Sequence, residues 1–298
     1  MAQRLTAHDF DHEVIVLFNA YVHGNIDRRT FLERAQKFAK AGMTAAGLLA
    51  ALAPDFAAGE QVKPDDARIK AEWLDIPSPQ GNGKIHAYLV RPASAAAGAK
   101  LPAVLVVHEN RGLNPHTQDI ARRLALDGFM ALAPDALTPV GGYPGNEEQA
   151  VQAFGKLDRD KTRQDFLAAA HWLKARGDGN GKVGAVGFCW GGGTTHWLAT
   201  QMPDLSAAVP FYGPAPAPED AAKVKAALLV QLAASDDYVN PTWARYEPAL
   251  KAAGARYEVF QYPGTYHGFN NDTTPRYDAA QAKVAWDRTV AFFRHNLG

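Results

Sequence analysis

Cys189 is the only cysteine in the chain, and it stands between Gly187 and Gly191 in the stretch VGAVGFCWGGG, residues 183–193. An apolar run precedes it and a predicted helix follows. A nucleophile at such a strand-to-helix turn needs glycine two positions before and after it, because the turn crowds the backbone. The N–H groups and dipole at the start of the next helix favour a thiolate or an oxyanion. The pattern therefore predicts a nucleophilic thiol.

A thiol nucleophile needs a base and a group that orients the base, and in α/β hydrolases the acid and then the histidine follow the nucleophile. Asp236 and Asp237 follow the predicted strand 227–232, and His267 follows the predicted strand 257–262. We predict that His267 is the base and that Asp236, rather than Asp237, orients it. The remaining histidines lack this placement and are assigned no role: His8, His12, His23, His86, His108, His116, His171, His196 and His295.

The loop after the predicted strand 103–108 reads HENRGLN and contains Glu109 and Asn110. In this fold class such a loop supplies the second amide of the oxyanion hole, so we expect the backbone N–H of Asn110 to act with that of Trp190. Each such donor contributes about 2.7–4 kcal/mol to transition-state stabilisation. Glu109 is either part of the site or a solvated loop charge.

Several aromatic residues could surround the predicted nucleophile, and the sequence lacks the common cofactor motifs. Trp190 belongs with a set that either lines an apolar pocket or packs in the core: Tyr143, Phe211, Tyr212 and Tyr266. The chain has no Gly-x-Gly-x-x-Gly after a strand, no P-loop and no Cys/His spacing typical of zinc sites. We therefore expect neither a cofactor nor a metal.

Short apolar segments alternate with amphipathic ones through most of the chain. The predicted strands are 85–90, 103–108, 129–134, 183–188, 207–212, 227–232 and 257–262, and the predicted helices are 117–127, 160–176, 192–201, 241–253 and 276–296. Continuous apolar runs such as AVLVV are typical of strands buried on both faces. The pattern predicts an α/β fold with a mostly parallel sheet and helices on both sides, whose ligands bind beyond the carboxyl ends of the strands.

The first 64 residues have a different pattern, which predicts a helical extension ahead of a catalytic domain at 65–298. Apolar residues at helical spacing indicate two helices, the second with Asp27 as its N-cap, and a linker follows at 54–64. The pair Arg28–Arg29 and the uncharged run 41–53 also resemble a twin-arginine export signal. We expect a retained extension and a cytoplasmic protein, with periplasmic export as the alternative.

Composition limits the classes of partner. Among 298 residues, Lys plus Arg and Asp plus Glu each number 31, so the net charge is zero and the chain offers no basic surplus for nucleic acid. The sequence has no run of about 20 apolar residues, the length needed to span a bilayer. One cysteine excludes an intramolecular disulfide. We expect a small-molecule substrate and a monomer or small homo-oligomer.

From about residue 69 onward, the chain resembles the dienelactone hydrolase (carboxymethylenebutenolidase) family of α/β hydrolases. The resemblance rests on four motifs together: GFCWGG, HENRGLN, SDDYVN and YHGF. It implies a triad of Cys189, Asp236 and His267. It also implies that Glu109 contacts the resting thiol and helps to take its proton when substrate arrives.

The sequence departs from this family at the residues that hold substrate. Members acting on dienelactone grip its carboxylate with two arginines, and one of these positions is Asn271 here. Arg276 is a candidate replacement, and Arg159 or Arg163 could supply the second arginine. We include Arg276, Tyr143 and Arg111 as candidate substrate-binding residues.

These observations predict a hydrolase that cleaves ester or lactone bonds of small molecules through a thioester on the cysteine. A thioesterase or acyl transferase with the same triad is the nearest alternative. A non-catalytic binding protein of the same fold is a second alternative. A redox sensor is a third, although it would usually need a resolving cysteine.

Overall fold

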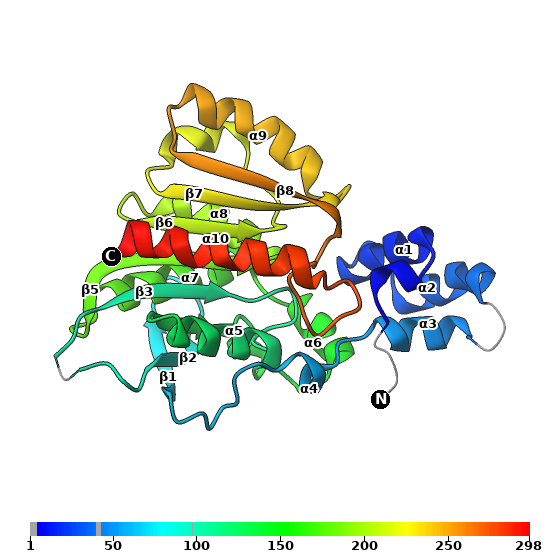
Figure 1. Ribbon diagram of the computed structural model, residues 1–298, viewed down its shortest axis with the longest axis horizontal. Coiled ribbons are helices and arrows are strands. Elements are labelled where there is room, and N and C mark those ends of the chain that lie inside the picture. The colour runs from blue at the N-terminus through cyan, green and yellow to red at the C-terminus, as the bar shows by residue number, and fades with distance from the viewer. Residues whose placement is uncertain (1–4, 40–42, 97) are drawn as a thin grey trace.

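The computed structural model describes residues 5–39, 43–96 and 98–298 (Figure 1). Eight strands form one sheet in the order β1-β2-β4-β3-β5-β6-β7-β8. They are β1 (Ile69–Ser78), β2 (Gly83–Pro92), β3 (Leu101–Val107), β4 (Met130–Pro134), β5 (Gly179–Phe188), β6 (Ala207–Phe211), β7 (Ala227–Ser235) and β8 (Tyr257–Tyr266). β2 runs antiparallel to both β1 and β4, and the other neighbouring strands are parallel. The predicted α/β fold with a mostly parallel sheet is confirmed.

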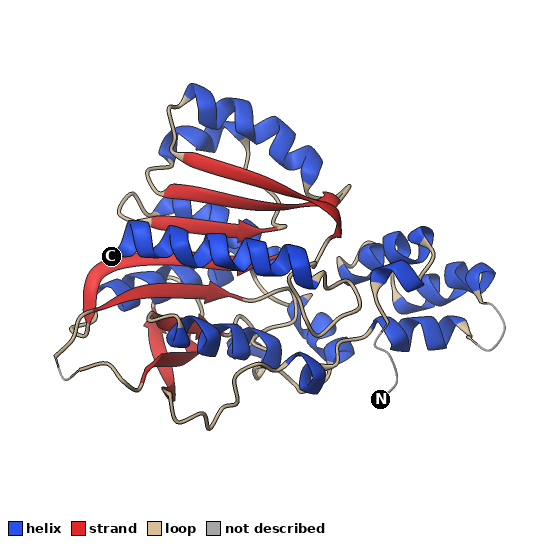
Figure 2. Ribbon diagram, in the orientation of Figure 1, coloured by secondary structure: helices blue, strands red, loops and turns tan. Residues whose placement is uncertain are grey.

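Helices cover both faces of the sheet (Figure 2). They are α5 (Pro115–Leu126), α6 (Glu147–Phe154), α7 (Arg159–Lys174), α8 (Trp190–Gln201), α9 (Asn240–Ala252) and α10 (Ala279–Leu297). α5 and α10 share one core with Val104 and Val106 of β3. α7, α8 and α9 share the other core with Leu105 and Val107. Because successive side chains of a strand point to opposite faces, one apolar run fills both cores.

Each predicted strand and helix of the catalytic domain has a counterpart, but the structure adds elements that the sequence pattern did not indicate. β1 is an edge strand with mostly exposed side chains, so it lacks the apolar run that marks the others. α6 is a short helix of 8 residues. The last helix was predicted to begin at Arg276, yet α10 begins after Asp278, whose carboxylate accepts a hydrogen bond from the N–H of Gln281. Arg276 therefore lies in a loop.

The N-terminal extension contains helices α1 (His12–Val22), α2 (Arg28–Ala35), α3 (Ala45–Leu52) and α4 (Phe56–Gly59). It has a small core of its own, built around residues such as Ile15, Phe18 and Phe31, against which Tyr266 of β8 also packs. Asp27 caps α2, as predicted, by accepting a hydrogen bond from the N–H of Thr30. The extension lies at the edge of the sheet where the parallel strands end (Figure 1).

The paired arginines open α2 of this extension rather than an irregular segment. Export and retention of the extension both stay predictions. Within residues 5–39, 43–96 and 98–298, no helix is both long enough and apolar enough to cross a membrane.

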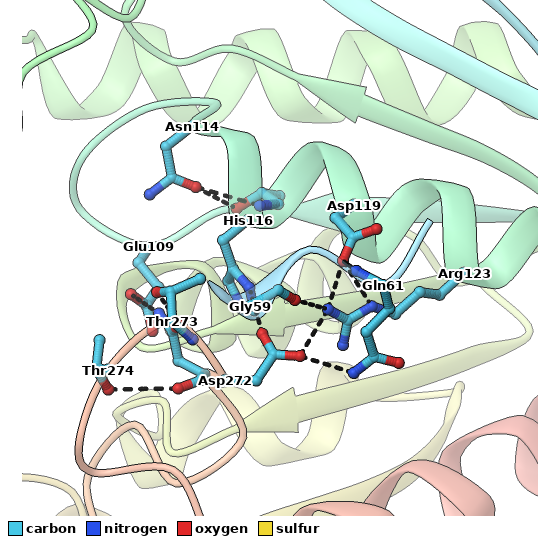
Figure 3. Close-up of polar contacts among 12 residues, drawn as sticks. Gly59, Gln61, Glu109, Asn114, His116, Asp119, Arg123, Asp272, Thr273 and Thr274 are labelled. Atoms are coloured by element: carbon cyan, nitrogen blue, oxygen red, sulfur yellow. Dashed lines mark hydrogen bonds and ion pairs between the residues drawn. The ribbon is translucent and has the colours of Figure 1, made fainter. Parts of the chain in front are cut away.

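A polar network joins the chain after α4 to the catalytic domain, as Figure 3 shows. Asp119 of α5 accepts hydrogen bonds from the backbone N–H groups of Gln61 and Val62, at 3.0 and 2.8 Å. Arg123 of α5 donates to Asp272, in the loop after β8, at 2.7 Å. The side chain of Gln61 also donates to Asp272, at 2.7 Å. The network thus links the extension, α5 and the loop that follows His267.

We predict that Asp272→Asn lowers the free energy of unfolding by about 2 kcal/mol, because it removes one of the two buried carboxylates that Arg123 binds, while Asp119 still pairs with that arginine. Burial would raise the pKa of Asp272, but His116, Arg123 and Gln61 outweigh it and lower that pKa to about 2. A depressed folded-state pKa gives stability that is present above about pH 4 and lost as the pH falls towards 2. Urea denaturation should show that the difference in free energy of unfolding between wild type and Asp272→Asn is smaller at pH 3 than at pH 7. Asp237→Asn, at an exposed position, is the matched control. Equal losses in free energy of unfolding for both variants would contradict the stabilising role of Asp272.

Candidate active site

Cys189 occupies the turn between β5 and α8, and its backbone lies at φ 55° and ψ −116°. A residue with a Cβ is strained in this conformation, by about 1–3 kcal/mol. Glycines make the turn sterically feasible: a Cβ at Gly187 would collide with the carbonyl of Gly191. A Cβ at Gly191 would collide with the carbonyls of Val107 and His108. The turn therefore holds the thiol at the start of α8.

His267 and Asp236 lie just beyond the ends of β8 and β7, and the structure brings them together. Nδ1 of His267 lies 2.7 Å from Oδ2 of Asp236, and both side chains are buried. Because a carboxylate only accepts hydrogen bonds, Nδ1 carries a hydrogen, and Nε2 is the nitrogen left to exchange a proton with the thiol. The other oxygen of Asp236 accepts from the N–H of Val239 at 3.0 Å. Asp237 is exposed and makes no such contact with His267.

His23, which ends α1, lies at this site although sequence analysis assigned it no role. Its Nε2 is 3.1 Å from Nε2 of His267 and 3.6 Å from Sγ of Cys189. Its ring stacks on Tyr238 with centroids 4.5 Å apart, and its Nδ1 is 2.8 Å from the carbonyl of Asn19. No local motif marks His23, because 166 residues separate it from Cys189 along the chain. Only the packing of the extension reveals it.

Cys189 and His267 shift each other's pKa in opposite directions. Burial alone raises the pKa of the Cys189 thiol, but the positive charges of His267 and His23 outweigh it and lower that pKa to about 6. Burial alone lowers the pKa of His267, but the negative charges of Asp236 and Cys189 outweigh it and raise that pKa. Together the two shifts favour a thiolate–imidazolium pair at neutral pH.

The two residues predicted to form the oxyanion hole, Asn110 and Trp190, line the same cavity as Cys189. The backbone N–H groups of Asn110 and Trp190 donate no hydrogen bond within the described part of the chain. The side chain of Asn110 donates to the carbonyl of Val22, at the end of α1, at 2.7 Å. The ring of Trp190 stacks on His108, which is fully buried and whose pKa burial lowers. The loop that offers the second amide is thus bound directly to the extension.

Glu109 differs from what the family resemblance implies. Its carboxylate accepts a hydrogen bond from Nδ2 of Asn271 at 3.3 Å, whereas the hydrogen bond that the structure gives to the thiol joins it to His23. Figure 3 shows Glu109 beside the loop that carries Thr273. Asn271, which stands where the resemblance implies a substrate-binding arginine, is therefore the amide partner of Glu109.

The three candidate substrate-binding residues contact other protein groups instead. Arg276 is buried, donates to Oδ1 of Asn19 at 3.0 Å and lies over the ring of Phe18. Arg111 pairs with Glu147 at 2.9 Å, and the hydroxyl of Tyr143 donates to the same carboxylate at 3.0 Å. None of the three lines the cavity at the thiol. These contacts come from the extension and α6, which the sequence could not place, and a role of the three residues in substrate binding stays a prediction.

A cavity of about 470 Å³ opens at Cys189. Its wall includes Trp190 and Tyr238, together with Arg159 and Arg163 from the first turns of α7. Other members of the proposed aromatic set do not line this cavity: Phe211 and Tyr212 are buried, with the ring of Tyr212 packed 5.0 Å from that of His267, and Tyr266 lines a neighbouring cavity. The arginines upstream of the elbow are therefore the ones that face this space.

The chain is similar to known hydrolases and to a family of short segments at its N-terminus. A model described as the dienelactone hydrolase family matches residues 85–297, and one described as YqhI-like matches residues 1–40. A predicted carboxymethylenebutenolidase of Escherichia coli (strain K12) is 33% identical over 249 residues, covering 79% of this chain and 90% of that protein. A predicted hydrolase fragment of the same strain, YghX, is 49% identical over 116 residues, which are 39% of this chain and 97% of the fragment.

Solved structures agree with these matches. A predicted dienelactone hydrolase from Klebsiella pneumoniae has a TM-score of 0.68 and 31% identity, covering 76% of this chain and 98% of that one. The dienelactone hydrolase-like promiscuous phosphotriesterase P91, from metagenomic libraries, has a TM-score of 0.65 and 26% identity, covering 78% of this chain and all of that one, 100%.

We predict that iodoacetamide alkylates Cys189 rapidly at pH 7 and that the rate falls about tenfold per unit below pH 6, because the thiolate is the reactive form. The lowered pKa of about 6 places the midpoint there. An ordinary thiol, with a pKa of about 8.5, would be mostly unreactive at pH 7. Intact-protein mass spectrometry in the presence of a chelator reads the single cysteine directly. His267→Ala should move the midpoint upwards, and a wild-type midpoint at pH 8 would refute the ion pair.

Proposed function

This chain belongs to the dienelactone hydrolase family, and we propose that it hydrolyses ester or lactone bonds of small molecules through a thioester on Cys189. The observation that carries the proposal is the arrangement at the strand ends. Sγ of Cys189 lies within 4.8 Å of Nε2 of His267. Nδ1 of His267 is in turn 2.7 Å from Asp236. A nucleophile, a base and an orienting carboxylate thus lie one next to the other, and the nucleophile faces a cavity.

The proposed reaction has two steps. The thiolate attacks the carbonyl carbon, and the electron pair of the carbonyl moves to oxygen, which the N–H groups of Trp190 and Asn110 bind. The intermediate collapses to a thioester while Nε2–H of His267 protonates the leaving alkoxide oxygen. Water then attacks the thioester, His267 takes its proton, and Cys189 leaves as the thiolate.

Leaving-group chemistry selects esters and lactones over amides. A thiolate is a better leaving group than an amine, so a tetrahedral intermediate with an amide would expel the thiolate and return to substrate. An alkoxide that receives a proton from His267 competes more evenly with the thiolate. The thioesterase alternative uses the same steps, with a thiol in place of the alcohol.

Glu109 has a different part in this proposal from the one that the resemblance implies. Its hydrogen bond to Asn271 directs it away from proton transfer with the thiol. Burial lowers the pKa of Arg276, and the negative charge of Glu109 opposes that shift. We assign Glu109 to compensating the buried charge of Arg276, beneath the extension.

The charges at the cavity wall favour substrates that carry a negative charge. Arg159 and Arg163 are exposed at its wall, and within the described residues neither has a carboxylate within 4.0 Å. Guanidinium groups bind carboxylates through two parallel hydrogen bonds. An ester or lactone with a carboxylate at some distance from the scissile bond would place that group against α7.

We predict that Cys189→Ala reduces turnover of p-nitrophenyl acetate and of simple lactones by more than about 1,000-fold, because it removes the nucleophile. Wild-type protein quenched early in the reaction should carry an acyl adduct on the one cysteine, visible by mass spectrometry. A thermal melt checks that the variant is folded. Equal hydrolysis by both proteins would show that Cys189 is not the nucleophile.

Arg159→Gln and Arg163→Gln should each raise KM for a carboxylate-bearing ester by about tenfold and leave kcat nearly unchanged, because a charge-assisted hydrogen bond contributes about 1.5–3 kcal/mol. KM for the matching neutral ester should not change. Arg245→Gln, at an exposed position of α9, is the matched control. Equal effects on both esters would remove the carboxylate from the proposed substrate class.

A further inference from the structure

Three potential metal ligands from distant parts of the chain converge at one point. A ring nitrogen of His23, a ring nitrogen of His267 and Sγ of Cys189 all lie within 4.8 Å of one another. His23 comes from the extension, whereas the other two residues come from the catalytic domain. The hydrolytic reaction uses Cys189 and His267 and gives His23 no step. The third side chain therefore calls for an explanation of its own.

Hydrogen bonds fix both imidazoles in the tautomer that a metal requires. Nδ1 of His267 faces the carboxylate of Asp236 at 2.7 Å, and Nδ1 of His23 faces the carbonyl of Asn19 at 2.8 Å. Both of those oxygens only accept hydrogen bonds, so each Nδ1 carries the hydrogen. The two Nε2 atoms therefore face each other at 3.1 Å with a proton between them, and loss of that proton leaves both lone pairs free to bind a metal. Metal-bound histidines have this arrangement, with the second nitrogen donating to a carboxylate or a backbone carbonyl.

Two of the three distances between the ligand atoms match the edges of a zinc tetrahedron. Bonds of about 2.05 Å to nitrogen and about 2.3 Å to sulfur, at tetrahedral angles, separate two nitrogens by about 3.3 Å and nitrogen from sulfur by about 3.6 Å. The observed separations are 3.1 Å between the Nε2 atoms and 3.6 Å from Nε2 of His23 to Sγ. The third pair, His267 and Cys189, lies within 4.8 Å, so closing that edge to about 3.6 Å completes the site.

We propose that His23, Cys189 and His267 form a three-ligand site for a borderline divalent metal ion of the Zn²⁺ class. Two imidazoles and one thiolate suit such an ion better than a hard cation that prefers oxygen ligands. His23 and Cys189 also line the cavity of about 470 Å³, which provides the path of entry and leaves the fourth coordination position open. Binding expels the protons that the thiol and the imidazoles hold among themselves, and these pass to the buffer.

Metal binding and ester hydrolysis exclude each other at this site. A bound ion occupies the electron pairs that Cys189 uses for attack and that His267 uses for proton transfer. Removing the ion restores both. By adding His23 as a ligand, the extension makes the catalytic pair of Cys189 and His267 sensitive to inhibition by metal ions.

The test measures binding directly, without substrate, on full-length protein stripped of metal with a chelator. Zn²⁺ binding is followed by calorimetry, and Co²⁺ binding by absorption, because a thiolate gives a charge-transfer band in the near ultraviolet and a tetrahedral site gives intense visible bands. His23→Ala removes only the ligand from the extension. Cys189→Ser keeps His23 but removes the thiolate, which guards against a misfolded first variant. His8→Ala, an exposed histidine of the extension, is the matched control.

We expect one Zn²⁺ per chain in wild type and in His8→Ala, with both Co²⁺ signatures. Affinity should fall by at least about 100-fold in His23→Ala, since loss of a second-sphere partner alone costs 10–100-fold as a rough guide. The charge-transfer band should be absent in Cys189→Ser. Equal affinity in His23→Ala and wild type would overturn the proposal, as would Co²⁺ spectra of wild type that show no thiolate band.

An esterase assay then separates this proposal from the proposed function. Zn²⁺ should inhibit wild-type hydrolysis, a chelator should reverse the inhibition, and His23→Ala should need about 100-fold more Zn²⁺ for the same effect. If the ester panel shows no activity while the Co²⁺ signatures are present, the metal site stands and the hydrolase assignment fails. If hydrolysis proceeds while the Co²⁺ signatures are absent, the hydrolase assignment stands and the metal site is refuted.

Discussion

The hydrogen bond between Asp236 and His267 is the interaction on which the chemistry of this site depends. It keeps the proton of the imidazole on Nδ1, 2.7 Å from the carboxylate, and directs Nε2 to the thiol. The ends of β7 and β8 make it possible, because parallel neighbouring strands deliver both loops to the same edge of the sheet. The strained turn at Cys189 supplies the third member at that edge. Nucleophile, base and orienter therefore meet without being near one another in sequence.

The extension is part of this site as well as a neighbour of it. Asn110 binds the end of α1 through the carbonyl of Val22, and Arg276 binds Asn19 one turn earlier. Both contacts use residues that sequence analysis had assigned to the oxyanion hole or to substrate. The buried guanidinium of Arg276 is stabilised by the side-chain oxygen of Asn19 and by the negative charge of Glu109, rather than by a ligand. Docking of α1 in this way is what carries His23 to the thiol.

Sequence analysis predicted the parts of the site that local chemistry specifies. The glycines around Cys189, the turn residues around His267 and the apolar strands each have a physical cause within a few positions, and the family and fold they indicated are confirmed. His23 and the true contacts of Arg276 could not be found in this way. They depend on how a separate helical core packs on the strand ends, and no spacing between residues 23 and 189 encodes that. The edge strand β1 was missed for a simpler reason, since its exposed side chains lack an apolar run.

The same feature that makes Cys189 a nucleophile also makes it a metal ligand. A depressed thiol pKa provides a thiolate at neutral pH, and an imidazole held by Asp236 provides a lone pair with a fixed direction. In a site with two such groups, a proton shared between them is the species that a metal must displace. A second imidazole, that of His23, shifts that competition, because it adds a coordinate bond to the metal and adds nothing that the ester reaction requires. The position of His23 therefore sets how the site divides between proton transfer and metal binding, while the triad sets what reaction it performs.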